Sequence, residues 1–277
     1  MHDRSNGGTD QVLNIPGKVS ERMACPDCKK TLIVLGDKYI QCAECNRMYP
    51  VVAGLSLPIL LSRRSEFATR DYGEWQRKEV LGTRKKGYRE SRFLPKTNVT
   101  NISEPAKNRF LNYLESGVVL NVGSGPRHIL IADNWISLDI APHANCEVVG
   151  DVQWLPFLDN SFDAVYSTSL FEHLRDPFTA AREITRVQRP GGVMWCDVPF
   201  AYPIHGSPND YFRYTPDGLK SVFADLETIE SGPSLGPVAA VALFSERIMD
   251  ALFPGRLGFI ARWCAAWTLQ RNCPDAS

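Results

Sequence analysis

Short apolar runs separated by polar segments predict a sheet with flanking helices in the second half of the chain. Apolar runs typical of buried strands occupy 117–123 (GVVLNVG), 135–142 (WISLDIAP), 146–157 (CEVVGDVQWLPF), 161–171 (SFDAVYSTSLF) and 191–200 (GGVMWCDVPF). The segment DPFTAAREITRVQRP predicts a helix, with Asp176 as its cap and Pro177 at its first position. Strands that alternate with helices favour an α/β fold with a doubly wound, mostly parallel sheet.

Further elements are expected on either side of this pattern. EPAKNRFLNYLES, from Glu104, has an apolar helical stripe, and FADLETIESGPS at 223–234 is expected to form one more strand. The C-terminal stretch 237–270 predicts two amphipathic helices. Their apolar stripes are Val241, Phe244, Ile248 and Leu252, and then Phe259, Trp263 and Trp267. These stripes fit a peripheral membrane contact, packing on the sheet, or a homodimer interface.

Overall charge identifies no partner, but the distribution of charge is uneven. The 277 residues include 31 Lys or Arg and 31 Asp or Glu, and 44% of the chain is hydrophobic. Residues 63–96 contain eleven basic and five acidic residues, a net charge of +6. This segment fits a solvated linker, a lid or an RNA contact. We expect a cytoplasmic protein, or one peripheral to the inner face of the membrane, because no stretch resembles a signal peptide or a spanning helix.

Four cysteines near the N-terminus have the spacing of a metal site. Cys25, Cys28, Cys42 and Cys45 form two C-x-x-C pairs, and the residues between the pairs predict a hairpin around Gly36. Two such pairs can direct four thiolates to one point, which gives a closed tetrahedral zinc site. A closed site leaves no position for a substrate, so we expect a structural Zn²⁺ in a zinc ribbon.

The residues after the second pair add a family resemblance. NRMYPVVAGLSLPIL continues the ribbon with Tyr-Pro-Val, a glycine and Leu-Pro-Ile-Leu. Over about residues 22–61 the chain resembles the zinc-ribbon methyltransferase-activator family, in which such a domain is a small partner subunit of methyltransferases. The resemblance implies that a methyltransferase follows in the same chain.

Residues suited to ligand binding lie at the ends of three of the predicted strands. Gly123 and Gly125 lie at the end of the first strand, Asp139 ends the second, and the third ends near Asp151. Ligands of parallel α/β sheets lie beyond the carboxyl ends of the strands. Glycines permit a close approach of the backbone, and an ionised carboxylate can accept both hydroxyls of a ribose. The ordered set predicts a site for a nucleoside-like cofactor.

VVLNVGSG, ISLDI and GDVQWLPFLDNSFDAVYSTSLFEHLRDPFTAAREITRVQRPGG together resemble the class I S-adenosylmethionine-dependent methyltransferases. The resemblance covers about residues 105–200 and implies a Rossmann-like sheet that binds S-adenosyl-L-methionine. The cofactor-binding residues that it implies are Asn121, Gly123, Ser124, Gly125, Asp139, Ile140, Asp151, Val152, Ser169 and Leu170. The chain departs from the family at Asn121, where an acid is usual, at Pro126 and Arg127, and in the short span from Gly125 to Asp139.

Acceptor-site candidates follow the fourth and fifth predicted strands. They lie in FEHL and in PFAYPIHGSPNDYFRYTPDGL, and a His or an acid there could take a proton from a hydroxyl or amine. The catalytic candidates are Glu172, His173, His205, Asp210 and Tyr211, with Arg213 and Tyr214 beside them.

The sequence predicts four parts: a zinc ribbon at 20–61, a basic linker or lid at 62–104, a methyltransferase domain at 105–232 and a helical extension at 233–277. We expect a methyltransferase that acts on a small-molecule, saccharide or lipid-linked acceptor. Two alternatives remain open: an RNA or ribosomal methyltransferase, and a non-catalytic protein that binds a partner.

Overall fold

The structure is a computed structural model of the 277-residue chain. It describes residues 15–52, 56–69, 110–111, 117–125, 132–142, 146–206 and 209–234, together with single positions between 240 and 252. The chain forms two compact units. The first comprises Met1–Gly82, Ser116–Ser167 and Phe178–Met194, and the second comprises Thr83–Glu115, Thr168–Pro177 and Trp195–Ser277.

The first unit begins with a short helix and a four-stranded antiparallel sheet. Helix α1 (Gly17–Ser20) precedes strands β1 (Leu32–Leu35), β2 (Tyr39–Cys42), β3 (Met48–Val52) and β4 (Leu57–Pro58), which pair in chain order. The predicted hairpin is confirmed, since Leu35 pairs with Tyr39 across a turn in which Gly36 has a φ of 64°. We call residues 20–61 the ribbon.

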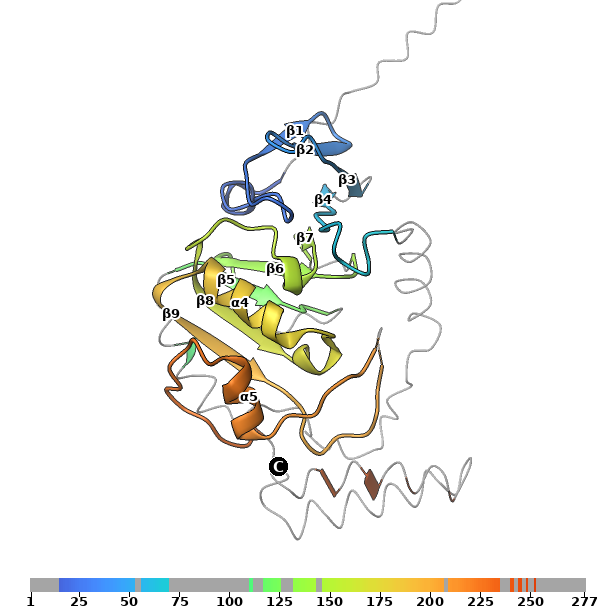
Figure 1. The fold of residues 1–277 in the computed structure, drawn as a ribbon, viewed down its shortest axis with the longest axis vertical. Coiled ribbons are helices and arrows are strands. Elements are labelled where there is room, and N and C mark those ends of the chain that lie inside the picture. The colour runs from blue at the N-terminus through green and yellow to red at the C-terminus, as the bar shows by residue number, and fades with distance from the viewer. Residues whose placement is uncertain are drawn as a thin grey trace, which may run out of the picture. The chain divides into compact units, whose positions relative to one another are not determined.

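A second sheet, of five strands, lies in the later part of the chain. Its strands are β5 (Val119–Val122), β6 (Trp135–Asp139), β7 (Val148–Val149), β8 (Phe162–Thr168) and β9 (Gln188–Asp197), in the order β7-β6-β5-β8-β9 (Figure 1). The β5–β6, β5–β8 and β6–β7 pairs are parallel. Helix α4 (Pro177–Val187) connects β8 to β9, and the α/β fold class is confirmed.

Strand β5 is central and almost wholly buried, as its apolar sequence predicts. Val119, Leu120 and Val122 are fully buried. Their neighbours Ile136 on β6 and Val165 on β8 pair with Leu120 from either side. This packing fixes the end of β5, and with it the start of the glycine loop at Gly123.

The ribbon joins the edge of the second sheet at β7. The backbone N–H of Leu60 donates to the carbonyl of Val149 (2.8 Å), and Ile59 forms a parallel bridge with the same residue. On the other side of the ribbon, the N–H of Ala24 donates to the carbonyl of Pro156 (2.9 Å). Ribbon and sheet therefore share backbone hydrogen bonds at two places.

Apolar side chains fill the junction between ribbon and sheet. The buried members of this cluster are Leu57, Ile59, Leu61, Phe67, Cys146 and Val149. The four residues from 57 to 67 come from the ribbon or the chain just after it, and the other two come from the β7 region. Burial of these apolar side chains stabilises the junction, because the removal of apolar surface from water is the main favourable term in folding.

The second unit has little regular structure among its described residues. It holds the 3₁₀ turn η2 (Phe171–His173) and helix α5 (Pro216–Val222), which Thr215 caps by accepting a hydrogen bond from the N–H of Gly218 (3.1 Å). The ring of Phe171 packs against Phe223, with centroids 4.9 Å apart. Described residues between 240 and 252 are helical, and the apolar stripe Val241, Phe244, Ile248 and Leu252 is exposed.

Several expected elements differ from the structure. Residues 223–234 contain no strand, because they form turns and bends after α5. Strand β7 has only two residues, since a 3₁₀ turn, η1 (Val152–Trp154), follows Asp151 at once. Strand β9 begins at Gln188, directly after α4, so the last three residues of the expected helix lie in the strand.

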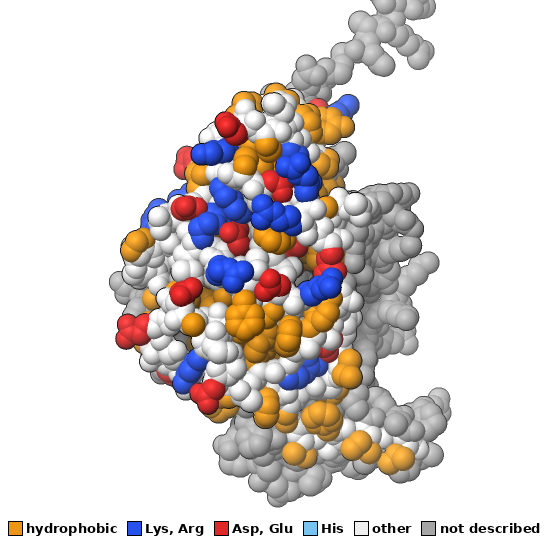
Figure 2. Space-filling view, viewed as in Figure 1, with side chains coloured by type: hydrophobic (Ala, Val, Ile, Leu, Met, Phe, Trp, Pro, Cys, Tyr) orange, Lys and Arg blue, Asp and Glu red, His pale blue; other side chains and the backbone are white. Residues whose placement is uncertain are grey.

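Other expectations fall on parts of the chain outside the described residues. These are most of the helix from Glu104, residues 70–96 of the basic segment, Pro126 and Arg127, and the second C-terminal helix. Among the described charged residues, basic and acidic side chains are interspersed on the face in Figure 2. No helix in the described part of the chain is long and apolar enough to cross a membrane.

Candidate functional site

The glycine loop after β5 adopts a conformation that suits glycine. Gly123 and Gly125 have φ values of 69° and 60°, in the left-handed region. The N–H groups of Gly123 and Ser124 donate to the carbonyl of Leu138 on β6 (2.9 and 3.2 Å). Among the described residues, the buried Ser124 hydroxyl has no hydrogen-bond partner, and no atom beyond the adjacent residues lies within 4 Å of the position of a Cβ on Gly125.

Asp139 connects the end of β6 to this loop. Its Oδ2 accepts a hydrogen bond from the N–H of Gly125 and its Oδ1 accepts one from the N–H of Ala141, both at 2.8 Å. The residue is almost fully buried. Gly123, Gly125 and Asp139 are therefore brought together, as the pattern of strand ends predicts.

Asp151 is held by a residue that the sequence did not suggest. The hydroxyl of Ser65 donates to its Oδ2 (2.6 Å), and the N–H of Gln153 donates to its Oδ1 (2.9 Å). The neighbouring guanidinium of Arg64 lies over the ring of Trp154, 5.0 Å from the centroid. The chain that leaves the ribbon thus covers the third strand end.

The remaining cofactor candidates have varied surroundings. Val152 is buried in η1, and Ile140 packs against the apolar cluster at the ribbon junction. The amide nitrogen of Asn121 lies 3.5 Å from the Ser137 hydroxyl on β6. In the second unit, Ser169 has a φ of 49°, donates its N–H to the carbonyl of Asp197 (2.9 Å) and precedes Leu170.

The four ribbon cysteines converge on one point. All four sulfur atoms lie within 4.8 Å of one another, with Cys25 and Cys45 3.7 Å apart and Cys28 and Cys42 3.4 Å apart. The N–H of Cys45 also donates to the sulfur of Cys42 (3.4 Å). The sequence prediction that these residues are neighbours is confirmed in the structure.

The two C-x-x-C pairs form matching turns. In the first turn, Lys29 has a φ of 60° and donates its N–H to the carbonyl of Cys25 (2.8 Å). In the second turn, Asn46 has a φ of 57° and donates its N–H to the carbonyl of Cys42 (3.1 Å). Left-handed conformations are costly for most residues, so the repetition indicates that both turns serve one geometry.

Polar residues around the cysteines complete this site. The Tyr49 hydroxyl lies 3.0 Å from the Cys25 sulfur. Asp27 accepts hydrogen bonds from Arg47 (2.7 Å), from the Ser62 hydroxyl (2.7 Å) and from the N–H of Arg63 (3.0 Å). Burial opposes ionisation of Asp27, but these donors outweigh burial and the pKa of the carboxyl is lowered. Sequence reasoning singled out none of these contacts.

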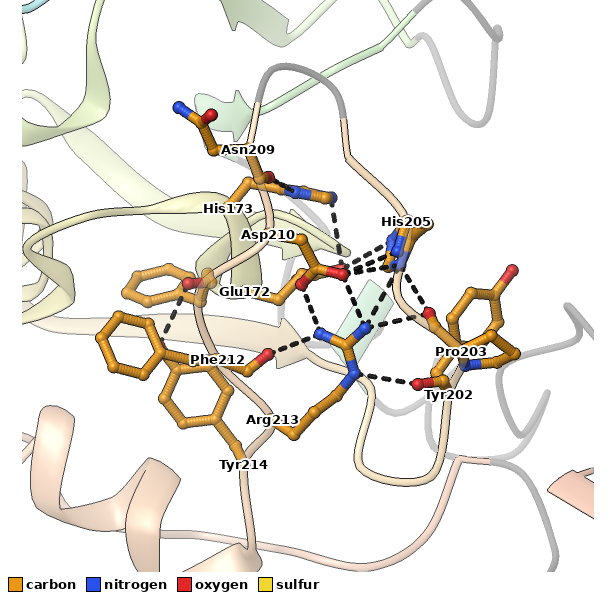
Figure 3. A network of polar contacts seen from close by, with 11 residues as sticks. Glu172, His173, Tyr202, Pro203, His205, Asn209, Asp210, Phe212, Arg213 and Tyr214 are labelled. Atoms are coloured by element: carbon orange, nitrogen blue, oxygen red, sulfur yellow. Dashed lines mark hydrogen bonds and ion pairs between the residues drawn. The ribbon is translucent and has the colours of Figure 1, made fainter.

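A cluster of acceptor atoms lies in the second unit (Figure 3). Glu172 is fully buried, and its Oε1 lies 3.7 Å from Nε2 of His173 and 3.7 Å from Nε2 of His205. Neither carboxylate oxygen has a hydrogen-bond partner among the described residues. Burial raises the pKa of Glu172 to about 7 and lowers the pKa of His173.

Backbone hydrogen bonds hold the cluster together. The N–H groups of Tyr211 and Phe212 donate to the carbonyl of Glu172 (2.7 and 3.2 Å), and the Tyr214 hydroxyl donates to the carbonyl of Phe171 (3.0 Å). The Nδ1 of His173 contacts the carbonyl oxygen of Asn209. Segment 209–214 is therefore fastened to η2, although about forty residues separate the two in the chain.

The other catalytic candidates have separate roles in the structure. Asp210 and Arg213 form a bidentate pair, in which Nη2 donates to Oδ2 at 2.7 Å. The hydrogen bond from Arg213 holds the pKa of Asp210 well below its usual range. Asp210 also accepts the N–H of His205 (2.7 Å), and so positions that residue. Tyr211 is exposed.

Part of the second sheet matches a known domain family. The methyltransferase domain family matches residues 130–196. A methyltransferase of Schizosaccharomyces pombe is 43% identical over 53 residues, which are 19% of this chain and 19% of the relative. A demethylmenaquinone methyltransferase of Renibacterium salmoninarum is 39% identical over 89 residues, which are 31% of this chain and 35% of the relative. The matched regions therefore span about a fifth to a third of these curated relatives.

The chain is also similar to solved structures. One is the complex between the Trm112 methyltransferase activator of Haloferax volcanii and its methyltransferase, at 21% identity and a TM-score of 0.38, with 56% of this chain and 73% of the other covered. Another is the [4+2]-cyclase SpnF, at 21% identity and a TM-score of 0.40, with 62% and 76% covered. Residues 130–196, which include β6, β7, β8 and most of β9 of the parallel sheet, thus match the methyltransferase domain family.

Proposed function

We propose that this protein transfers a methyl group from S-adenosyl-L-methionine to an acceptor, and that its ribbon holds a structural Zn²⁺. One observation carries the proposal. The glycine loop, Asp139 and Asp151 follow three adjacent parallel strands, β5, β6 and β7, in the order that a nucleoside-containing cofactor requires.

The glycine loop fits the cofactor. In the described part of the chain, the buried Ser124 hydroxyl has no hydrogen-bond partner and no side chain fills the space beside Gly125. Asp139 would accept the ribose hydroxyls, because carboxylate oxygens accept more than one hydrogen bond each. Asp151 would accept the adenine amino group while Ser65 fixes its orientation. The cofactor, when bound, supplies the electrophilic methyl group.

The ribbon cysteines fit zinc equally well. Sulfur atoms that surround Zn²⁺ tetrahedrally at about 2.3 Å lie about 3.8 Å from one another. The two measured pairs lie 3.7 and 3.4 Å apart. Tyr49 and the N–H of Cys45 would donate to two of the thiolates. The ion would be structural, because four protein ligands complete its coordination.

The ribbon would support the cofactor site from within the same chain. Its contacts with Val149 and Pro156 border the two-residue strand β7, and the chain that follows it reaches Asp151 through Ser65. A strand of two residues has few hydrogen bonds of its own. We infer that the ribbon holds β7, and hence Asp151, in place.

The acceptor is proposed to be a small molecule with a hydroxyl group. The sequence relatives include demethylmenaquinone methyltransferases, whose name denotes a small-molecule acceptor. Glu172 and His173 follow the carboxyl end of β8, where class I enzymes bind the acceptor. Their cluster with His205 offers groups of suitable basicity for a hydroxyl proton, and much of the acceleration would come from positioning the acceptor in line with the methyl group.

Calorimetry with S-adenosyl-L-methionine and its demethylated product tests the proposal. The zinc-loaded full chain should bind both, and Asp139→Asn should weaken binding at least tenfold. Asp133→Asn, which changes an exposed acid, should leave binding unchanged. Absence of binding by the folded wild type would refute the proposal, and binding without transfer to any small-molecule, lipid or RNA fraction would favour a non-catalytic role.

A further inference from the structure

Three hydrogen-bond acceptor atoms face one another around Glu172 without a proton donor between them. One ligand atom of each of Glu172, His173 and His205 lies within 4.8 Å of the other two, and Nε2 of both histidines lies 3.7 Å from Oε1 of Glu172. The carboxylate is fully buried, and both of its oxygens lack hydrogen-bond partners among the described residues. A buried carboxylate of this kind is costly unless a cation or a proton compensates it.

His173 is oriented so that Nε2 presents a lone pair. Its Nδ1 contacts the backbone carbonyl of Asn209, which can only accept a hydrogen bond. The proton of the neutral ring is therefore assigned to Nδ1. Metal-ligating histidines are usually fixed in this way, by a carbonyl or carboxylate on the other ring nitrogen.

His205 is oriented in the same manner. Its Nδ1 lies 3.3 Å from the carbonyl oxygen of Pro203 and 3.5 Å from Oδ2 of Asp210, both of which are acceptors. Nη2 of Arg213 is also 3.5 Å away, but its two protons are used by Asp210 (2.7 Å) and Pro203 (3.0 Å). The proton is again assigned to Nδ1, and Nε2 faces Glu172.

We propose that Glu172, His173 and His205 form a binding site for a divalent transition-metal ion, distinct from the cysteine site of the ribbon. Two imidazole nitrogens and one carboxylate are a ligand set for Zn²⁺, Mn²⁺ or Fe²⁺ that leaves coordination positions open. Ligand atoms at about 2.1 Å from such an ion lie about 3.0–3.4 Å apart. The observed separations of 3.7 Å need to contract by only a few tenths of an ångström.

The open positions would take an oxygen ligand. Binding of the ion rests on the geometry of this cluster alone, whereas a part in catalysis rests on the proposed function. A hydroxyl of the acceptor that coordinates the ion would lose its proton more readily, because the positive charge stabilises the alkoxide. The acceptor class that this site favours is an alcohol or phenol rather than an amine.

Cobalt(II) titration of the full chain, with its ribbon already filled by one equivalent of Zn²⁺, tests the inference. Wild type should bind one equivalent of Co²⁺ and show weak ligand-field bands without sulfur-to-cobalt charge transfer. Glu172→Gln and His205→Gln should each weaken this binding at least tenfold. Glu227→Gln, at an exposed acid, is the matched control and should bind as wild type.

Proton NMR of the wild-type cobalt form gives a second readout that needs no variant. Two hyperfine-shifted, exchangeable imidazole N–H signals are expected, one from Nδ1 of each histidine. Absence of Co²⁺ binding or of both signals would overturn the inference, and so would unchanged binding in Glu172→Gln. Those results would indicate that a proton, rather than an ion, compensates Glu172. Cofactor calorimetry on the same samples reports separately on the proposed function.

Discussion

The hydroxyl of Ser65 donates a 2.6 Å hydrogen bond to Oδ2 of Asp151, so the chain leaving the ribbon contacts the carboxylate proposed to bind adenine. Ser65→Ala should remove this orientation and weaken S-adenosyl-L-methionine binding about three- to tenfold, in line with about 1 kcal/mol for a hydrogen bond. Calorimetry measures the change. Ser20→Ala, on an exposed hydroxyl of α1, should not alter affinity, and an equal loss in both variants would contradict the prediction.

Gly125 and Gly36 form a matched pair for testing the glycine loop. Their φ values are 60° and 64°, and no described atom beyond the adjacent residues lies within 4 Å of the position that a Cβ would take at either glycine. Replacement by Ala should cost each about 1–2 kcal/mol through backbone strain. Only Gly125→Ala should also weaken cofactor binding more than tenfold, because its methyl group would occupy the cofactor's space. Equal affinities of the two folded variants would place the cofactor elsewhere.

Removal of the proposed Zn²⁺ should destabilise more than the ribbon. Chelation, or Cys28→Ser, would release the two turns that hold the ribbon together, and with it the side chains of Leu57 and Ile59 at the sheet junction. We expect a lower melting temperature and loss of cofactor binding, both restored in the chelated wild type by added Zn²⁺. Thermal unfolding monitored by circular dichroism, together with zinc analysis, checks this. A melting temperature independent of zinc would argue against a structural ion.

Glu183 connects helix α4 to the turn of the first C-x-x-C pair. Its Oε2 accepts a 2.7 Å hydrogen bond from Lys29, and its Oε1 accepts a 2.8 Å bond from Arg186. Burial opposes ionisation, but the hydrogen bond from Arg186 and the charge of Lys29 outweigh it, so the pKa of Glu183 is lowered from 4.5. A lowered folded-state pKa stabilises the fold above the unfolded-state value and loses that stabilisation as the pH falls.

Glu183→Gln should therefore cost about 1–2 kcal/mol of unfolding free energy at pH 7. The difference from wild type should narrow as the pH is lowered below 4.5. Urea unfolding of both proteins between pH 7 and pH 3 measures this. Asp133→Asn should show no such pH-dependent difference, and a constant difference for Glu183→Gln would mean that the charge is not what stabilises the junction.

Local patterns were sufficient to predict the cysteine site and the order of the strand ends. C-x-x-C spacing fixes the geometry of each turn, and the apolar runs around Leu120 and Leu138 define strands whose carboxyl ends must share an edge of a parallel sheet. Functional residues that lie within a few residues of a strand or turn can therefore be predicted from the sequence. The short length of β7 could not be predicted, since a two-residue strand depends on the ribbon beside it.

Contacts between segments that are far apart in the chain could not be predicted from such local patterns. Ser65 and Asp151 are 86 residues apart, and Asp27 meets Ser62 across 35 residues. The sequence suggested both His173 and His205, but not that Asn209 and Asp210 orient their rings towards Glu172. Those relationships depend on how residues 203–206 and 209–214 pack against η2, which contacts between distant side chains decide.

The parallel bridge between Ile59 and Val149 has a consequence for self-association. An uncovered edge strand offers unpaired N–H and C=O groups to any other chain, and β7 is an edge strand of the second sheet. The ribbon occupies that edge with hydrogen bonds of its own, so two copies cannot pair there while it is in place. The proposed Zn²⁺ would thus also protect this edge, and zinc-depleted protein should be more prone to self-association.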